Sequence, residues 1–398
     1  MSANPINAHM RTLLAASEST FNTPVALAAA QAMRAVTVNL GRASQPGNVR
    51  AARDRASGRG LVSEFVEGDK DPVDFSLEYS QRGRSAIDSA AFDLAVMKAA
   101  GLKQTINGST STVLSLVPTP IENGEFSPLQ LARFLGEGAA LAEMELLSGG
   151  VVKSLKWSGG DKEVTVMASG QGASKAFGGR IDSFTFALAG TTSVTISAAE
   201  AKKLCAGLSY QIESEIVTCV SVNYSTGATT WTRGAYSSTA AGHTAQPLYP
   251  YLPPSLSYGG TSPISEATAS AILGSISPMR IMSWEVDLTT GMDLLPAETS
   301  SAYRQGPKSV RHDVKVKLKM VMPQDRADLL GYSINRDTLQ LTLSQGTGTG
   351  SIMTFVMPYC EVMPFEIADT ADDIAIIDVE LRVRNNTTGD NAMTITLT

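Results

Sequence analysis

The sequence has few of the residues on which enzyme chemistry usually depends. Its 398 residues include 3 cysteines and 3 histidines. Cys205, Cys219 and Cys360 are odd in number and lack the spacing of metal ligands, which favours free thiols in a reducing cytoplasm. The histidines lie in unrelated contexts, whereas hydrolysis would need a nucleophile and a base that meet in space. We therefore expect no catalytic residue, no metal site and no cofactor, and we do not expect an enzyme.

An excess of positive charge is also absent. The formal net charge is −6 and the pI is near 5.3, whereas a protein that reads nucleic-acid sequence usually carries a basic patch. No apolar run reaches the ~18 residues of a membrane-spanning helix, and no signal peptide is evident, so we expect no membrane anchor. The glycines at 170, 172, 178 and 179 lack the strand–GxxxxGK–helix context of a phosphate loop. These absences leave a soluble, β-rich protein with 43% hydrophobic residues.

The most regular stretch of the chain predicts a strand followed by a helix. From Val73 to Ser80, apolar and polar residues alternate strictly, which is typical of a strand with one buried face and one solvated face. From Ala86 to Ala100 the apolar residues keep roughly helical spacing, and Gly101 suits the end of a helix. We compare the rest of the chain with this strand and helix.

A second unit of the same kind runs from 312 to 331. It has an alternating strand, Pro323 at the first position of a short helix, and Gly331 at its end. Neighbouring strands also correspond in order: 33–40 with 279–288, 114–120 with 353–358, and 163–170 with 374–383. A repeat of this length predicts two copies of one domain fold. The alternative is that two strand-rich domains resemble each other only in outline.

Three segments do not belong to this repeat. Residues 41–60 contain five arginines and one acid, and we expect a long exposed loop that either orders on assembly or stays flexible. The stretch from Ser127 to Leu147 predicts a helix, with Ser127 as the N-cap and Pro128 at the first helical position. Short strands separated by turn residues predict a small β module at 190–250, and the proline-rich segment 247–263 reads as an extended return path.

Several motifs resemble the major tail tube proteins of long, non-contractile-tailed bacteriophages. The segment LLAASESTFNTP at 13–24 is similar to the family pattern LL-A-x-E-S-T-Y/F-G-T-x-P, with Asn22 where glycine is usual. The strand VDFSLEYS and the helix ending VMKAAGL follow it in the family order, as do the last strands from ILGSISPMRIMSWEVDL to MTITL. The inserted module, with TRG at 232–234 and an ending at His243, resembles a small β module of phage tail proteins.

The resemblance implies a fold class and a domain plan. The fold expected is mainly β, a β-sandwich- or barrel-derived tail tube fold with two related units that each carry a short helix. Residues 1–189 would form the first unit, 190–250 an inserted, outward-facing module that assembly does not need, and 251–398 the second unit. Two tandem units would let three chains build a pseudo-sixfold ring, whereas one larger tube domain per chain would need six chains.

The resemblance also implies a function. The chain would be a structural virion protein that is assembled in the host bacterial cytoplasm and resides in the virion tail. Its partners would be its own copies in stacked rings, the tape measure protein, the tail terminator and distal tail proteins, and DNA that passes non-specifically through the lumen. The alternative is a carbohydrate- or receptor-binding β protein of a phage tail.

Charges on the two repeated strands suggest separate roles for their polar faces. We expect Asp74 and Glu78 to face the lumen, because lysines there would bind DNA phosphates and slow its passage. Lysines on the second strand are expected to meet carboxylates of another subunit instead. The inter-subunit candidates are Lys315, Lys317, Lys319, Arg50, Arg53 and Arg55. The simpler alternative is that all these residues occupy solvated strand faces.

Overall fold

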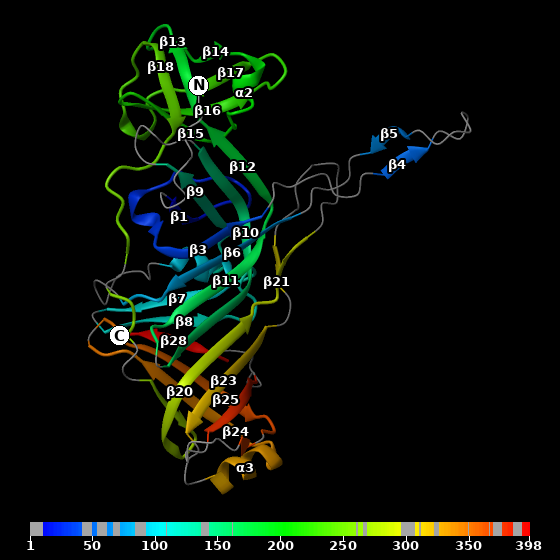
Figure 1. Ribbon diagram of the computed structural model, residues 1–398, viewed down its shortest axis with the longest axis vertical. Helices are drawn as coiled ribbons and strands as arrows, with labels where there is room; N and C mark the ends of the chain where they lie inside the picture. Colours follow the sequence, from blue (N-terminus) through cyan, green and yellow to red (C-terminus); the bar gives the residue numbers. More distant parts are fainter. Residues whose placement is uncertain are drawn as a thin grey trace.

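A computed structural model confirms a mainly β protein (Figure 1). It describes residues 11–41, 50–53, 62–66, 72–83, 93–108, 110–136, 143–160, 162–259, 262–265, 269–295, 307–309, 312–321, 326–348, 350–365, 367–368, 376–384 and 392–398. The molecule is elongated, with a small β module at one end of the long axis and a helix at the other.

Two long antiparallel runs of strands enclose the main core. Sheet I is ordered β3 (Ala35–Leu40), β6 (Val73–Ser80), β11 (Thr165–Gly172), β10 (Glu143–Gly160), β20 (Ile276–Thr289), β23 (Asp313–Val321) and β27 (Ile376–Val383). Sheet II is ordered β7 (Leu102–Asn107), β8 (Ser111–Leu116), β28 (Thr394–Leu397), β25 (Met353–Val362), β24 (Thr338–Gln345) and β19 (Ser270–Leu273). The pairings of β25 with β27 and of β19 with β20 join the two sheets into one closed barrel. Between the sheets, the rings of Trp157 and Trp284 lie 5.7 and 5.5 Å from the ring of Phe355 and meet it edge to face.

The same sequence of elements occurs twice. A first strand (β3 or β20) leads to a two-stranded hairpin and returns as a second strand (β6 or β23) that pairs with it. The hairpins are β4–β5 (Arg50–Arg53, Val62–Val66) and β21–β22 (Met292–Leu294, Pro307–Ser309). A helix (α1, Leu94–Ala99, or α3, Arg326–Asn335) and a strand pair (β7–β8 or β24–β25) follow. Strand β11 or β27 then pairs with the second strand. The strand pairing therefore repeats together with the sequence pattern.

The predicted helices differ from the observed ones at their ends. The first is α1, Leu94–Ala99, and the earlier part of the predicted 86–100 segment lies mostly outside the described residues. The second is α3, Arg326–Asn335, which continues through Gly331 instead of stopping there. Arg336, with φ of 57°, makes the left-handed turn that ends it. A glycine in a short helix is tolerated and is not by itself a stop signal.

The helix predicted from Ser127 to Leu147 is wrong. The chain there forms β9 (Leu129–Leu135) and the start of β10, which pair with each other and with β1 (Arg11–Ser17). Leu129 and Leu131 face the main core, whereas Ala132 and Phe134 face a second core beneath the module. A strand that is buried on both faces loses the alternation of apolar and polar residues, so its apolar run imitates helical spacing.

The small module is one six-stranded sheet that begins earlier than predicted. Its order is β13 (Ile181–Phe186), β18 (His243–Pro250), β15 (Ser209–Ile212), β16 (Glu215–Val222), β17 (Ala228–Thr232) and β14 (Ser193–Thr195). Strand β13 pairs with β18, so the sheet includes residues 181–186, which the sequence pattern places in the first unit. The predicted boundary at residue 190 follows a change of composition, and that change marks the loop between β13 and β14.

The module shares a hydrophobic core with the first unit. Leu14, Ala132 and Leu146 are in register on β1, β9 and β10, and they belong to the same buried cluster as Phe184 and Tyr210 of the module. The expectation that the module is a dispensable attachment therefore conflicts with the packing. Because both sheets bury apolar residues in this core, the contact between the module and the first unit contributes to the stability of the fold.

Candidate functional site

The outward face of sheet I is one continuous polar surface that spans both repeats. Cross-strand register puts Glu78 beside Met167, Met167 beside Lys156, Lys156 beside Asp287, and Asp287 beside Lys315. Residues that are directly opposite each other point to the same side of a sheet. The polar side chains of β6 and β23 therefore share one face, although they belong to different repeats.

The predicted lumen residues of the first repeat are held by neutral partners on adjacent strands. The Gln171 side chain donates to Asp74 Oδ1 at 2.9 Å, and the Thr37 hydroxyl donates to Glu78 Oε2 at 3.3 Å. Asp74 is exposed and Glu78 is half-buried. This part of the face is mostly Ser, Thr and amide, with isolated negative charges.

The lysines of the second repeat lie among carboxylates of their own chain. Lys317 is directly opposite Glu285 on β20 and Glu380 on β27. Lys319 lies opposite Asp378, and Lys315 Nζ is 3.8 Å from Asp313 Oδ2. A groove of about 1030 Å³ crosses this face beside Lys317 and Lys319.

The polar strand faces of the two repeats are therefore not separate surfaces within one chain, and which part of the shared face meets the lumen stays a prediction. Asp74, Glu78 and the three lysines occupy the same face of one sheet. The sequence pattern gives the face of each strand but not the pairing of β10 with β20 that joins the two faces. The contact of the lysines with another subunit stays a prediction.

Neutralising the carboxylates around the lysines is expected to create a DNA-binding surface. In Glu285→Gln/Glu380→Gln, Lys317 loses both opposite charges and Lys156 loses its 2.7 Å ion pair with Glu285. We expect affinity for duplex DNA to rise about tenfold at low salt, with a log–log salt slope near −2 for about two phosphate contacts. Fluorescence anisotropy of labelled DNA at several salt concentrations measures both quantities.

Asp74→Asn/Glu78→Gln is the matched control, because it changes the net charge equally on the same face but far from the lysines in strand order. Equal DNA binding by the two double variants would contradict local masking and would favour a simple effect of net charge.

The arginine candidates of the first repeat lie on the hairpin that stands away from the body. Arg50 and Arg53 are the ends of β4, which pairs with β5 (Figure 1). Arg55 lies outside the described residues. The predicted long loop thus contains a hairpin. In chain order, it lies between β3 and β6, just as β21–β22 lies between β20 and β23 in the second repeat.

A buried charge cluster in the module was not predicted from the sequence. Arg233 donates to both oxygens of Glu215 at 2.7 Å and lies 3.8 Å from the centre of the Phe186 ring. The two ring nitrogens of His243 contact Glu213 and Glu215 at 2.7 and 2.8 Å. Arg233 also donates to the Thr191 carbonyl, and Glu215 accepts from the Gly234 and Ala241 amides, so the arrangement ties the turn between β15 and β16 to neighbouring loops.

The electrostatics of Glu215 agree with a structural role. Burial alone raises the pKa of this carboxyl, but hydrogen bonds from Arg233, the Ala241 amide, His243 and the Gly234 amide outweigh it and lower the pKa to about 2. Glu215 is therefore a permanently charged anchor. In the sequence, the available signal for this cluster was the acidic pair Glu213 and Glu215 in an isoleucine-rich strand pair. His243 alone did not show which residues these carboxylates would contact.

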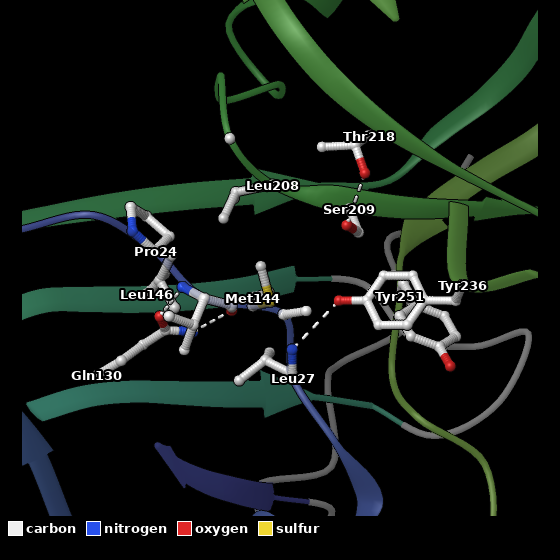
Figure 2. Close-up of a pocket in the computed structure, with 13 residues that line it drawn as sticks. Pro24, Leu27, Gln130, Met144, Leu146, Leu208, Ser209, Thr218, Tyr236 and Tyr251 are labelled. Atoms are coloured by element: carbon white, nitrogen blue, oxygen red, sulfur yellow. Dashed lines mark hydrogen bonds between the residues drawn. The ribbon is translucent and has the colours of Figure 1, made fainter. Parts of the chain in front are cut away.

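A small pocket of about 200 Å³ marks the joint between module and first unit (Figure 2). Met144 and Leu146 line its lower side, and Leu208 lies across from them. The Tyr236 hydroxyl accepts a hydrogen bond from the Leu27 amide at 3.2 Å and closes one end. Both sheets supply apolar side chains to its walls, together with the polar Gln130, Ser209 and Thr218, so the pocket is a packing gap where the two sheets meet.

Two buried carboxyls in the first unit each have an oxygen without a hydrogen-bond partner. Glu18 accepts from the Gly149 amide at 2.9 Å through Oε1, and Asp93 accepts from the Tyr79 hydroxyl at 2.9 Å through Oδ2. Burial raises the pKa of Glu18 to about 7, against the hydrogen bonds from backbone amides. Burial likewise raises the pKa of Asp93 to about 6, against the hydrogen bond from Tyr79.

Glu18 is expected to make the protein less stable as pH rises. The folded chain holds the Glu18 proton more tightly than the unfolded chain, whose carboxyl titrates near 4.5. The stabilisation is therefore complete below about pH 4.5 and is lost as pH rises to about 7, by at most about 3 kcal/mol. Urea unfolding at several pH values measures this loss. Glu18→Gln should remove much of the slope, and an unchanged slope would contradict the assignment.

Comparisons with models of protein families and with curated proteins find no match to this chain. Among the described residues, no group of three or more His, Cys, Asp or Glu side chains is arranged to hold a metal ion. Within the same part of the chain, no helix is long and apolar enough to cross a membrane. The candidate site is the polar face of sheet I, on which side chains from both repeats lie in register.

Proposed function

We propose that this chain is a structural protein that polymerises as stacked rings into the hollow tail tube of a long-tailed bacteriophage. The observation that carries the proposal is the junction of the two repeats. Strand β10 of the first repeat pairs with β20 of the second over Ser154–Gly160 and Thr289–Ser283, so two repeats already share one sheet. A ring needs the same kind of junction between chains, and closing the sheet would remove its edges.

The polar face suits a conduit for DNA and the tape measure protein. Its lysines lie among carboxylates, so a phosphate backbone meets no continuous basic surface. Two repeats per chain favour three chains in each ring, with the β4–β5 hairpin placed to reach a neighbouring ring. The other proposed partners are the tail terminator and distal tail proteins, and the proposed location is the virion tail.

Negative-stain electron microscopy of the purified full-length protein tests the proposal. We expect hollow filaments, with image averages that show three chains and pseudo-sixfold symmetry in each ring. Discrete particles at every concentration would overturn the tube function and would favour the alternative, a receptor- or carbohydrate-binding tail protein, which glycan-binding assays would then examine. Rings of six chains would overturn only the assignment of one tube unit to each repeat.

A further inference from the structure

One edge of sheet I has no strand beside it. Among the described strands, β3 pairs only with β6. The Gly41 amide bonds to the Asp74 carbonyl at 2.7 Å, so the backbone groups of alternate residues Val38 and Leu40 point away from β6. These groups form a row of donors and acceptors at the edge of the sheet.

The internal repeat shows what fits such an edge. Val38 is opposite Leu77 on β6, just as Trp284 is opposite Leu318 on β23. Strand β20 is therefore the counterpart of β3, and its second edge is covered by β10. The Thr290 amide bonds to the Lys153 carbonyl at 2.9 Å, so Trp284 and alternate residues of β20 direct their backbone groups toward β10. The exposed row on β3 has the same alternation.

The counterpart of β10 lies at the far end of the same sheet. Strand β10 pairs with β11, and β26 (Ile367–Ala368) likewise pairs antiparallel with β27, the counterpart of β11. The other end of β27, residues 381–383, pairs with Cys360–Val362 of β25. The Met363 amide also bonds to the Glu380 carbonyl of β27 at 2.9 Å. A second copy of the chain thus carries, at one end of sheet I, the element that the first copy lacks at the other.

In the single chain, charged side chains occupy the edge of β3. Lys175 Nζ donates to the carbonyls of Leu40 and Gly41 at 3.1 and 2.7 Å, and Arg133 Nη1 donates to the Val38 carbonyl at 3.4 Å. Glu145 binds both cations, with Lys175 Nζ 3.2 Å from its Oε1. Only 3% of the Lys175 side chain is exposed, so the contact is a built part of the fold. Inward-facing charge is a known protection of edge strands.

We infer that β3 receives the β26 edge of a second copy, and that Lys175 and Arg133 form a latch which holds the β3 carbonyls until that copy displaces it. This inference rests on the proposed function, because it names the edges that join in a ring. The incoming strand supplies backbone amides to Val38 and Leu40, and the displaced cations keep Glu145 as their partner. Exposed Phe177, whose ring centre lies 5.0 Å from Lys175 Nζ, is then covered.

Two variants of the full chain test the inference by sedimentation velocity over a concentration series. Lys175→Met removes the main latch bonds and should lower the concentration for self-association roughly tenfold, about the strength of one net hydrogen bond. Val38→Pro removes an outward amide from an edge strand, a position where proline is tolerated, and should abolish association while the monomer stays folded by circular dichroism. Lys202→Met, an exposed lysine of the small module, is the control and should associate as the unmodified chain does.

Hydrogen exchange of the Val38 and Leu40 amides gives a readout that does not need tubes. Both amides should exchange in the monomer and become protected in every associated form. A folded Val38→Pro chain that still forms tubes would overturn the edge assignment and leave the tube function intact. Association enhanced by Lys175→Met and blocked by Val38→Pro, but without tubes, would support the edge and overturn the function. If Lys175→Met does not fold, protection of these amides on association decides the question.

Discussion

A chain in which residues 181–250 are replaced by a short Gly/Ser linker is expected to aggregate instead of forming a trimmed, soluble protein. Removal of the module uncovers a row of apolar side chains on one face of β1, β9 and β10. The row consists of Leu14, Ala132, Phe134, Met144 and Leu146. Each large side chain that returns to water costs about 1.5–3 kcal/mol, and the sum is comparable to the whole stability of a typical domain.

Size-exclusion chromatography and thermal unfolding of the deletion protein measure this effect. A matched rescue replaces Phe134, Met144 and Leu146 by serine in the same deletion, which should restore much of the solubility by making the uncovered face polar. A deletion protein that is monomeric and melts like the full chain would show that the shared core is unimportant. Aggregation that persists in the serine-substituted deletion would point to a cause other than the uncovered face.

Replacing Gln345 by leucine is expected to be among the most damaging single substitutions at the junction of the repeats. Its Oε1 accepts from Trp284 Nε1 at 2.6 Å and from the Gly160 amide at 2.9 Å. Its Nε2 donates to the carbonyls of Lys162 and Ser265 at 2.8 and 3.1 Å. One buried amide thus satisfies the Trp284 side chain of β20 and three backbone groups, including the Gly160 amide at the end of β10.

Leucine has a similar size but leaves these four groups without a partner. Each unsatisfied buried group costs about 1–3 kcal/mol, so we expect the free energy of unfolding to fall by roughly 4 kcal/mol or more. Urea denaturation followed by tryptophan fluorescence measures the change. Gln340→Leu, at an exposed position of the same strand, is the control and should change stability by less than about 0.5 kcal/mol. Equal effects of the two substitutions would contradict the special role of Gln345.

The largest gap between sequence and structure concerns strands that are buried on both faces. Alternation in Val73–Ser80 and in 313–321 predicted β6 and β23 correctly, including which residues face the core. The segment 129–135 has no such alternation, because one face meets the main core and the other meets the module core. In the sequence, Arg133 was the available sign that this segment contacts a distant part of the chain, because a charge within an apolar strand needs a specific partner.

By itself, the sequence determined the mainly β class, the repeated strand–helix order and the polar face of each repeated strand, because these properties follow from local periodicity. It also indicated a separate module, although not its first strand. The tertiary structure alone decided that β10 joins β20, that Asp74 and Lys317 share one face, and that Lys175 reaches the edge of β3. Such contacts link residues far apart in the chain, and their energy depends on packing and hydrogen bonding that no local pattern contains.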